Sequence, residues 1–224
     1  MNKVCHIIVA AGTGSRFGGR LPKQFCEMKD GRPVLMTTLD RMEGDKVLVI
    51  SREMEQLWRE LCERNGFSSP RIVFGGATRW ESVKNALATI PGGYDVITVH
   101  DGARPLVDRE LIERVVSPLL EDNSLDGTIP AVEVTDSLRE ITSEGNHAAD
   151  RRRFRAVQTP QGFRAELLRE AYLLPYRETF TDDASVMEAA GYSRLKLVEG
   201  DPKNIKITRP GDIEIAEIYL ASER

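Results

Sequence analysis

Cysteine is scarce in this sequence, and long apolar runs are absent. The chain has three cysteines in 224 residues, Cys5, Cys26 and Cys62, an odd number without metal-ligand spacing. This usage is typical of a reducing cytoplasm. No apolar run approaches the roughly 18 residues that a membrane span requires. The first ten residues, MNKVCHIIVA, are more typical of a first strand than of a signal peptide. We therefore expect a cytoplasmic protein without a membrane partner.

Positive charge is not in excess either. The formal net charge is -4 at pH 7, and the sequence pI is about 5.6. A dedicated nucleic-acid-binding domain is usually basic, so this balance argues against a nucleic-acid partner. Any anionic ligand must be attracted by a local group of cations rather than by the charge of the whole protein.

Two common nucleotide-binding motifs are also missing. A dinucleotide fingerprint requires G-x-G-x-x-G, but Phe17 stands at the third glycine position after Gly12 and Gly14, and Gly18 comes one residue late. A P-loop requires Gly-Lys followed by Ser or Thr, and the sequence contains no such triplet. The chain is therefore neither an NAD-binding protein nor a P-loop NTPase by signature.

Short apolar runs alternate with helical patterns, as in βαβ units around a mostly parallel sheet. At this length the pattern predicts one Rossmann-like α/β domain, a twisted sheet flanked by helices, over residues 1–224. The expected strands are 5–10, 46–50, 71–74, 95–100, 127–132 and 194–199, the fifth weakened by Pro130. The expected helices are 33–42, 53–65, 80–90, 108–121, 164–174, 182–190 and 211–221.

One polar segment, residues 134–159, interrupts this alternation. It contains a Ser-Glu-Gly-Asn turn signal near its middle and no linker that would suggest a separate domain. We interpret it as a β-hairpin arm that projects from the sheet.

The first predicted strand leads into a glycine-rich and cationic loop. In IIVAAGTGSRFGGRLPKQF (7–25), four glycines follow the two alanines and three cations stand among them, while residues 1–26 contain no acid. Ligands of open parallel sheets bind beyond the carboxyl ends of the strands, where backbone N–H groups can surround an anion. The loop is either a phosphate cradle or a glycine-rich turn with solvated charges, and glycines alone do not decide between these.

Seven motifs resolve this ambiguity by resemblance. They occur in order from about residue 5 to residue 218: AAGTGSRFG with PKQF, GGATRWESVKNAL, HDGARP, VTDSLRE, VQTPQGF, FTDDAS and VEGDPKNIKITRP. Together they resemble the nucleotidyltransferases that activate sugar and polyol phosphates, and among these the family of 2-C-methyl-D-erythritol 4-phosphate cytidylyltransferases. The resemblance implies transfer of CMP from CTP to a polyol phosphate, with release of pyrophosphate, in the non-mevalonate route to isoprenoids.

The resemblance also implies which cations are catalytic. Arg16 and Lys23 fall on the two basic positions that hold the triphosphate, and Lys206 matches a third cation from the far end of the chain. The attacking phosphate monoester has a second pKa near 6, so it is largely dianionic at neutral pH without a protein base. This agrees with a sequence that has only three histidines and no recognisable nucleophile triad.

Further residues are implied for nucleotide, substrate and metal. Asp101 follows a strand and is expected to bind Mg²⁺ or a similar divalent cation, because hard cations favour oxygen ligands. The expected nucleotide-binding residues are Ala10, Ala11, Gly12, Gly14, Gly76, Arg79 and Ser82. The expected substrate-binding residues are Asp101, Arg104, Ser137, Arg151 and Thr159.

Several of these residues have simpler structural interpretations. Asp101 could cap a helix or turn, Arg79 could form a plain salt bridge, for instance with Glu81, and Trp80 could serve packing. His100 is expected to be a packed strand-end residue. In TDDAS (181–185) the aspartates are expected to cap a helix rather than to bind metal.

The family resemblance implies that the 134–159 arm crosses to a second subunit of a homodimer and helps to complete its site. Arg151 is placed by counting back from QTPQ without gaps, but Arg152, Arg153 and Arg155 leave the register open. Three other functions remain: a ribitol 5-phosphate cytidylyltransferase, a nucleotide-sugar glycosyltransferase, and a non-catalytic nucleotide-binding relative. The first usually has two glycines where Ala11-Gly12 stand, and the second requires a DxD-type carboxylate pair at a strand end.

Overall fold

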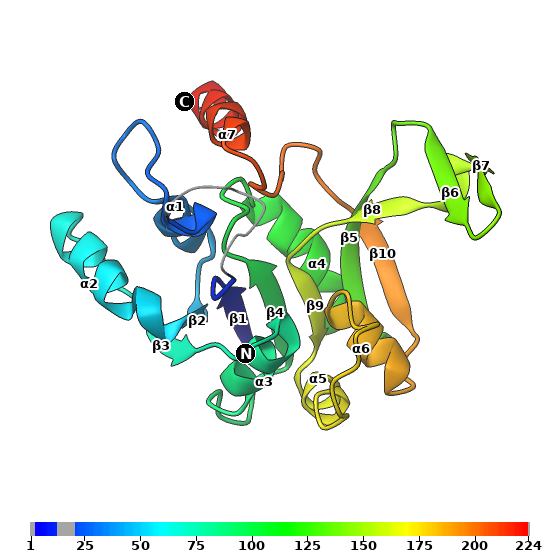
Figure 1. Ribbon diagram of the computed structural model, residues 1–224. Coiled ribbons are helices and arrows are strands. Elements are labelled where there is room, and N and C mark those ends of the chain that lie inside the picture. The colour runs from blue at the N-terminus through cyan, green and yellow to red at the C-terminus, as the bar shows by residue number, and fades with distance from the viewer. Residues whose placement is uncertain (1–2, 13–20, 224) are drawn as a thin grey trace.

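The computed structural model describes residues 3–12 and 21–223, and in this part of the chain one twisted sheet is flanked by helices (Figure 1). The strand order is β10-β5-β9-β4-β1-β2-β3, with β8 paired to β5. The pairs β1–β2, β1–β4, β2–β3 and β5–β10 are parallel, whereas β9 is antiparallel to both neighbours. The strands are β1 (Val4–Val9), β2 (Asp45–Ile50), β3 (Arg71–Phe74), β4 (Val96–Asp101), β5 (Gly127–Glu133), β8 (Arg155–Val157), β9 (Gln161–Arg164) and β10 (Leu195–Glu199).

The helices bury both faces of this sheet. Side chains alternate along a strand, so Ile7 of β1 packs into one apolar cluster and Ile8 into another. The first cluster includes residues of α3 (Arg79–Leu87), α5 (Ala165–Ala171) and α6 (Asp183–Ala189). The second includes residues of α1 (Val34–Arg41), α2 (Glu55–Arg64) and α4 (Arg109–Glu121). The last helix, α7 (Gly211–Ser222), closes a smaller cluster with Met28, Leu106 and Ile207.

The six predicted strands and seven predicted helices are present, with most of their ends shifted by one to three residues. Asp108 caps α4 as expected, accepting from the Leu111 amide at 2.7 Å. Residue 53 lies in a 3-10 turn, η2 (Arg52–Met54), ahead of α2. Pro130 lies inside β5, at the point where the antiparallel partner of this strand changes from β9 to β8. The Pro130 carbonyl accepts a hydrogen bond from the Gln158 amide. The missing donor of Pro130 therefore falls at a break in the antiparallel pairing.

The predicted hairpin consists of β6 (Leu138–Thr142) and β7 (Gly145–Ala149), which form a separate two-stranded sheet. Figure 1 shows it projecting beyond β5 and β8. Thr142 pairs with Gly145, whose φ of 129° suits glycine, so the predicted turn signal is confirmed. The projecting part is shorter than the predicted 134–159, because 155–157 pair with β5 and Gln158 and Thr159 are buried.

No helix in residues 3–12 and 21–223 is both long enough and apolar enough to cross a lipid bilayer. The three cysteines are free thiols, two of them buried.

We expect the protein to lose stability in mild acid because of His6. This imidazole is buried in β1, and its Nδ1 lies 2.7 Å from Thr98 Oγ1. Burial, and then the charge of Lys46, lowers the pKa of His6 from 6.5 to about 4. A depressed pKa favours the neutral form in the folded state, so this stabilisation is present above pH 6.5 and is lost as the pH falls toward 4.

From pH 7.5 to pH 5.0 this group should lower the free energy of unfolding by about 2 kcal/mol. Urea unfolding at both pH values should show that His6→Asn removes about that much of the pH dependence. His147→Asn, on the exposed hairpin, is the matched control and should leave the dependence unchanged. An identical pH dependence in the wild type and His6→Asn would contradict this explanation.

Candidate active site

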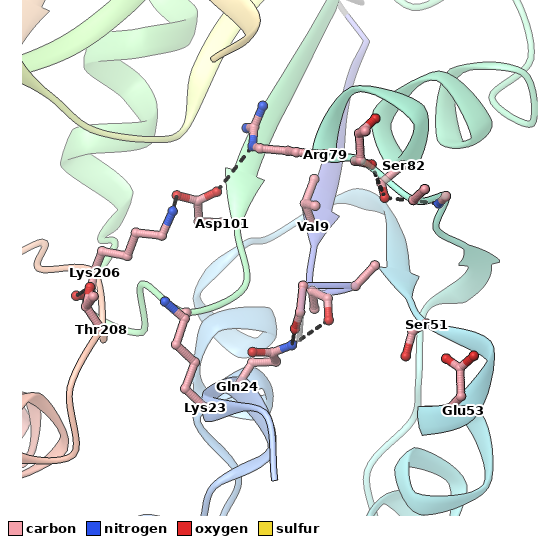
Figure 2. Close-up of a pocket in the computed structure, with 17 residues that line it drawn as sticks. Val9, Lys23, Gln24, Ser51, Glu53, Arg79, Ser82, Asp101, Lys206 and Thr208 are labelled. Carbon is pink, nitrogen blue, oxygen red and sulfur yellow. Dashed lines mark hydrogen bonds and ion pairs between the residues drawn. The ribbon is translucent and has the colours of Figure 1, made fainter. Parts of the chain in front are cut away.

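A pocket of about 520 Å³ lies beyond the carboxyl ends of β1, β2 and β4, the edge at which open α/β sheets bind ligands. We call it the strand-end pocket. It is lined from several distant segments of the chain, and Figure 2 shows the side chains directed into it. The lining residues are 9–12, Lys23, Gln24, Ser51, Glu53, 76–79, Ser82, Asp101, Ala103, Lys206 and Thr208.

Two lysines from opposite ends of the sequence meet at this pocket. Lys23 begins a 3-10 turn, η1 (Lys23–Phe25), and Lys206 lies between β10 and α7. Both line the strand-end pocket, and Figure 2 shows them on either side of the segment that follows β4. The two remaining predicted loop residues, Gly14 and Arg16, lie outside the described residues. The structure thus brings together two of the three predicted catalytic cations.

Asp101 is the carboxylate at the centre of this cationic group. Its Oδ2 lies 2.9 Å from Lys206 Nζ and 3.6 Å from Arg104 Nε, and its Oδ1 lies 3.6 Å from Arg79 Nε. Burial alone would raise the pKa of Asp101, but the positive charges of Arg79, Lys206 and Arg104 hold it well below its usual range. Asp101 is therefore a permanently charged acceptor at neutral pH. Its carboxylate is paired with these three cations, which is more than the simple capping interpretation requires.

Arg104 and Thr159 lie beneath Asp101 rather than on the pocket surface. Arg104 is buried and donates from Nη1 to the Asn204 carbonyl at 2.8 Å. The Asp101 amide donates to Thr159 Oγ1 at 3.0 Å, and Asn204 Nδ2 donates to the Thr159 carbonyl at 2.8 Å. His100 is buried beside them, as expected, with its Nδ1 3.1 Å from Thr159 Oγ1. Within one chain these side chains fix Asp101 in place.

The Gly75-Gly76 segment is pressed against the first loop and α3. A Cβ at Gly75 would lie 2.4 Å from Ala11 Cβ and 2.7 Å from Ser82 Oγ, so only glycine fits. The Gly76 amide donates to Ser82 Oγ at 3.2 Å, and this hydroxyl donates to the Thr78 carbonyl at 2.9 Å. The predicted nucleotide-binding residues Ala10, Ala11, Gly12, Gly76 and Ser82 consequently share one wall of the strand-end pocket.

Arg79 also lines the pocket, but its partners differ from the simple salt bridge considered above. Glu81 is engaged elsewhere, since it closes a capping box with Thr78 at the start of α3. Arg79 Nη2 instead donates to Asp183 Oδ2 at 2.6 Å, and its Nε faces Asp101 (Figure 2). Asp182, the neighbour of Asp183, caps α6 as predicted. Trp80 is buried and stacks on Tyr172, which confirms its packing role.

Comparison with known proteins identifies the family. A family model described as 2-C-methyl-D-erythritol 4-phosphate cytidylyltransferase matches residues 4–222. A relative of that name from Bacteroides fragilis is 44% identical over 220 residues, which cover 96% of this chain and 98% of the relative. The chain belongs to this cytidylyltransferase family. The resemblance drawn from the seven motifs is confirmed, and so is the nucleotidyltransferase class.

Other relatives and solved structures of the cytidylyltransferase family agree. A relative of the same name from Porphyromonas gingivalis is 45% identical over 221 residues, covering 96% of this chain and 97% of the relative. The crystal structure of the Thermus thermophilus cytidylyltransferase matches with a TM-score of 0.72 and 30% identity over 96% of this chain and 98% of that one. A 4-diphosphocytidyl-2C-methyl-D-erythritol synthase structure from Anaerococcus prevotii matches with a TM-score of 0.80 and 26% identity over 98% and 96% of the two chains. The predicted single α/β domain is thereby confirmed.

In this family member, Ser137 and Arg151 lie outside the strand-end pocket. Both are exposed at the base of the hairpin, where Arg151 donates from Nη1 to the Thr135 carbonyl. Arg152 pairs with Asp150. Within one chain these two residues do not line the pocket, whereas Asp101 lines it and Arg104 and Thr159 lie buried beneath Asp101.

Sequence reasoning missed two contributions to the cytidylyltransferase site. Gln24 is buried, and its Nε2 donates to the carbonyls of Ala10 at 2.6 Å and Gly12 at 2.9 Å. It thus fastens the start of the first loop to η1. Ser51 and Glu53 line the end of the pocket away from Lys206 (Figure 2). The only available signal for Gln24 was a polar side chain inside the quoted PKQF motif, and Ser51 and Glu53 had none.

Proposed function

We propose that this family member transfers CMP from CTP to 2-C-methyl-D-erythritol 4-phosphate in the strand-end pocket. The observation that carries the proposal is the meeting of Lys23 and Lys206 around Asp101 at one sheet edge. A triphosphate and a phosphate monoester bring several negative charges together, and charge also develops on the leaving oxygens. Positioned cations in a partly enclosed pocket are the means by which proteins lower such barriers.

The phosphate monoester of the polyol attacks the α-phosphorus of CTP in line, and pyrophosphate leaves. The monoester is largely dianionic at neutral pH, so no general base is needed. Burial lowers the pKa of His100 to about 4, which leaves this nearby imidazole neutral and engaged with Thr159 and the Arg104 carbonyl. Lys23 and Arg16 hold the triphosphate, and Lys206 stabilises charge on the transferred phosphoryl group.

The opposite wall of the pocket binds the nucleoside. Ala10, Ala11, Gly12, Gly76 and Ser82 line that wall, and the Gly76 amide is held by Ser82 Oγ. Cytosine differs from uracil in its donor–acceptor pattern, because its ring nitrogen accepts and its exocyclic amine donates. Backbone amides and carbonyls held by the close Gly75–Ala11 contact can therefore discriminate the base.

Mg²⁺, or a similar divalent cation, fits the residues present. Mg²⁺ is usually held by one or two carboxylates, substrate phosphates and waters rather than by a protein cage. Asp101 is a carboxylate directed into the strand-end pocket, and the described residues contain no group of three or more His, Cys, Asp or Glu side chains suited to a metal. Asp101 would thus be its protein ligand, and the bound ion would neutralise phosphate charge.

We propose that the hairpin arm completes the site of a second subunit in a homodimer. The support is that Ser137 and Arg151 are exposed on the arm and remote from their own pocket, while Thr159 lies under Asp101. Light scattering should give the mass of two chains. Mixing Arg151→Ala with Lys23→Ala should restore activity in mixed dimers, because one of the two sites then retains both residues. A monomer, or mixtures that regain nothing, would contradict the arm's role.

The proposed reaction is tested by pyrophosphate release from CTP, UTP and ATP, each with 2-C-methyl-D-erythritol 4-phosphate or ribitol 5-phosphate. We expect the highest kcat/KM for CTP with the methylerythritol phosphate. Faster turnover of ribitol 5-phosphate would show that it, and not the methylerythritol phosphate, is the preferred acceptor. No release of pyrophosphate with either acceptor would refute the proposed function.

A further inference from the structure

A fully buried carboxylate, Asp183, stands directly behind the strand-end pocket. It is the first residue of α6 and its side chain has no exposed surface. Both of its oxygens are engaged: Oδ2 accepts from Arg79 Nη2 at 2.6 Å, and Oδ1 accepts from the Tyr172 hydroxyl at 2.6 Å. Tyr172 is itself buried, and its ring stacks on Trp80 with centroids 5.8 Å apart and an interplanar angle of 17°.

These contacts continue into the catalytic cluster. Arg79 Nε faces Asp101 Oδ1 at 3.6 Å, which is an ion pair beyond hydrogen-bonding distance, whereas its bond to Asp183 is short. Asp101 in turn holds Lys206 at 2.9 Å. One continuous set of polar contacts therefore joins five residues from distant parts of the chain. They are Tyr172, which directly follows α5, Asp183 in α6, Arg79 in α3, Asp101 in β4 and Lys206 in the segment before α7.

The geometry shows which carboxylate holds Arg79. Asp183 accepts the hydrogen bond from the Arg79 guanidinium, so this guanidinium remains beyond hydrogen-bonding distance from Asp101. Without the charge of Asp183, Arg79 would turn to Asp101, the other carboxylate it is paired with. It would then compete with Lys206 for the same side chain, and a bidentate Arg–carboxylate pair is geometrically favourable.

We propose that Asp183, fixed by Tyr172, is a positioning residue that keeps Arg79 from occupying Asp101, so that Asp101 remains available to Lys206 and to the substrate side of the pocket. This rests on the proposed function, because it assigns Asp101 and Lys206 to CMP transfer. Asp183 touches no reacting atom. It acts through Arg79, and that dependence separates it from a residue that only stabilises α6.

The test is a double-mutant cycle on kcat for CMP transfer. Asp183→Asn should lower kcat about tenfold, since misplacement of a catalytic group can cost up to about a hundredfold, with the KM for CTP changed less than about twofold. Arg79→Gln should also lower kcat about tenfold, because it removes a cation that faces Asp101 in the pocket. If Asp183 acts only through Arg79, the double variant should be no slower than Arg79→Gln alone. Independent effects would instead multiply to about a hundredfold loss, and that result would overturn the proposal.

The matched control is a second buried acid paired with arginine, far from the pocket. Asp126 is 2% exposed and its Oδ1 accepts from Arg194 Nη2 at 2.6 Å. Asp126→Asn should lose stability without lowering kcat, and an equal loss of kcat in this variant would attribute the effect to general destabilisation and overturn the proposal.

A milder variant keeps the inference testable if Asp183→Asn does not fold. Tyr172→Phe removes one hydrogen bond to Asp183 and retains the ring. It should lower kcat about two- to fivefold in the wild-type background and not at all in the Arg79→Gln background. A wild type without any turnover would refute the proposed function and this inference with it, whereas multiplicative effects in an active enzyme would refute the inference alone.

Discussion

Replacing Lys23 by alanine is expected to lower kcat for CMP transfer by about 10²–10³, the effect of removing one donor to a developing oxyanion. Lys23 is the first residue of η1 and lines the strand-end pocket together with Lys206 (Figure 2). Its ammonium group is assigned to the triphosphate. Negative charge develops on the leaving oxygen there as the bond between the α-phosphorus and pyrophosphate breaks. The free energy of unfolding should change little, because the side chain is only half-buried.

The matched control for this variant is Lys29→Ala. Lys29 follows Lys23 closely in sequence, but its side chain is 79% exposed and pairs with Glu217 on α7. Its removal takes away the same charge from the same region and should leave kcat within about twofold, since exposed pairs contribute little. Steady-state kinetics decide the matter, and near-normal kcat in Lys23→Ala would refute the assigned role.

Asp101→Asn is expected to impair both activity and folding. The variant leaves Arg79, Arg104 and Lys206 around a neutral amide, and it removes the carboxylate assigned to Mg²⁺. Breaking a buried pair by neutralising one partner costs about 3–5 kcal/mol of stability. Loss of charge balance at the reacting phosphates should lower kcat by about 10²–10³.

The two effects of Asp101→Asn can be separated with the remote Asp126→Asn variant described above. Urea unfolding should show both variants to be less stable than the wild type, and kinetics at a temperature where both are folded should show only Asp101→Asn to be slow. Full activity of folded Asp101→Asn at saturating Mg²⁺ would contradict the assignment.

Much of the fold follows from local sequence. The buried strands are short runs of apolar residues, and their near-continuous hydrophobicity is what strands covered on both faces require. Strand β9 was not predicted, because QGFR contains a single large apolar residue. It forms a strand only because it lies antiparallel between β4 and β5, a pairing that no local pattern records.

In the candidate site, too, some features follow from local sequence and others depend on tertiary packing. Lys23, Asp101 and Lys206 stand in motifs that resemble a known family, and the structure brings them to one pocket. Asp183 was interpreted as a helix cap, which is true of its neighbour Asp182. One of its two partners, Arg79, is 104 residues away in the sequence. Such a pair is created by the packing of α3 against α6 across one face of the sheet, and sequence spacing contains no trace of it.

A crystal structure of the protein with CTP bound would test the central claim most directly. We predict that the triphosphate oxygens lie within hydrogen-bonding distance of both Lys23 Nζ and Lys206 Nζ, with cytosine against Gly76 and Ser82. A triphosphate that contacts neither lysine, or a nucleotide bound away from the carboxyl ends of β1 and β4, would contradict the account.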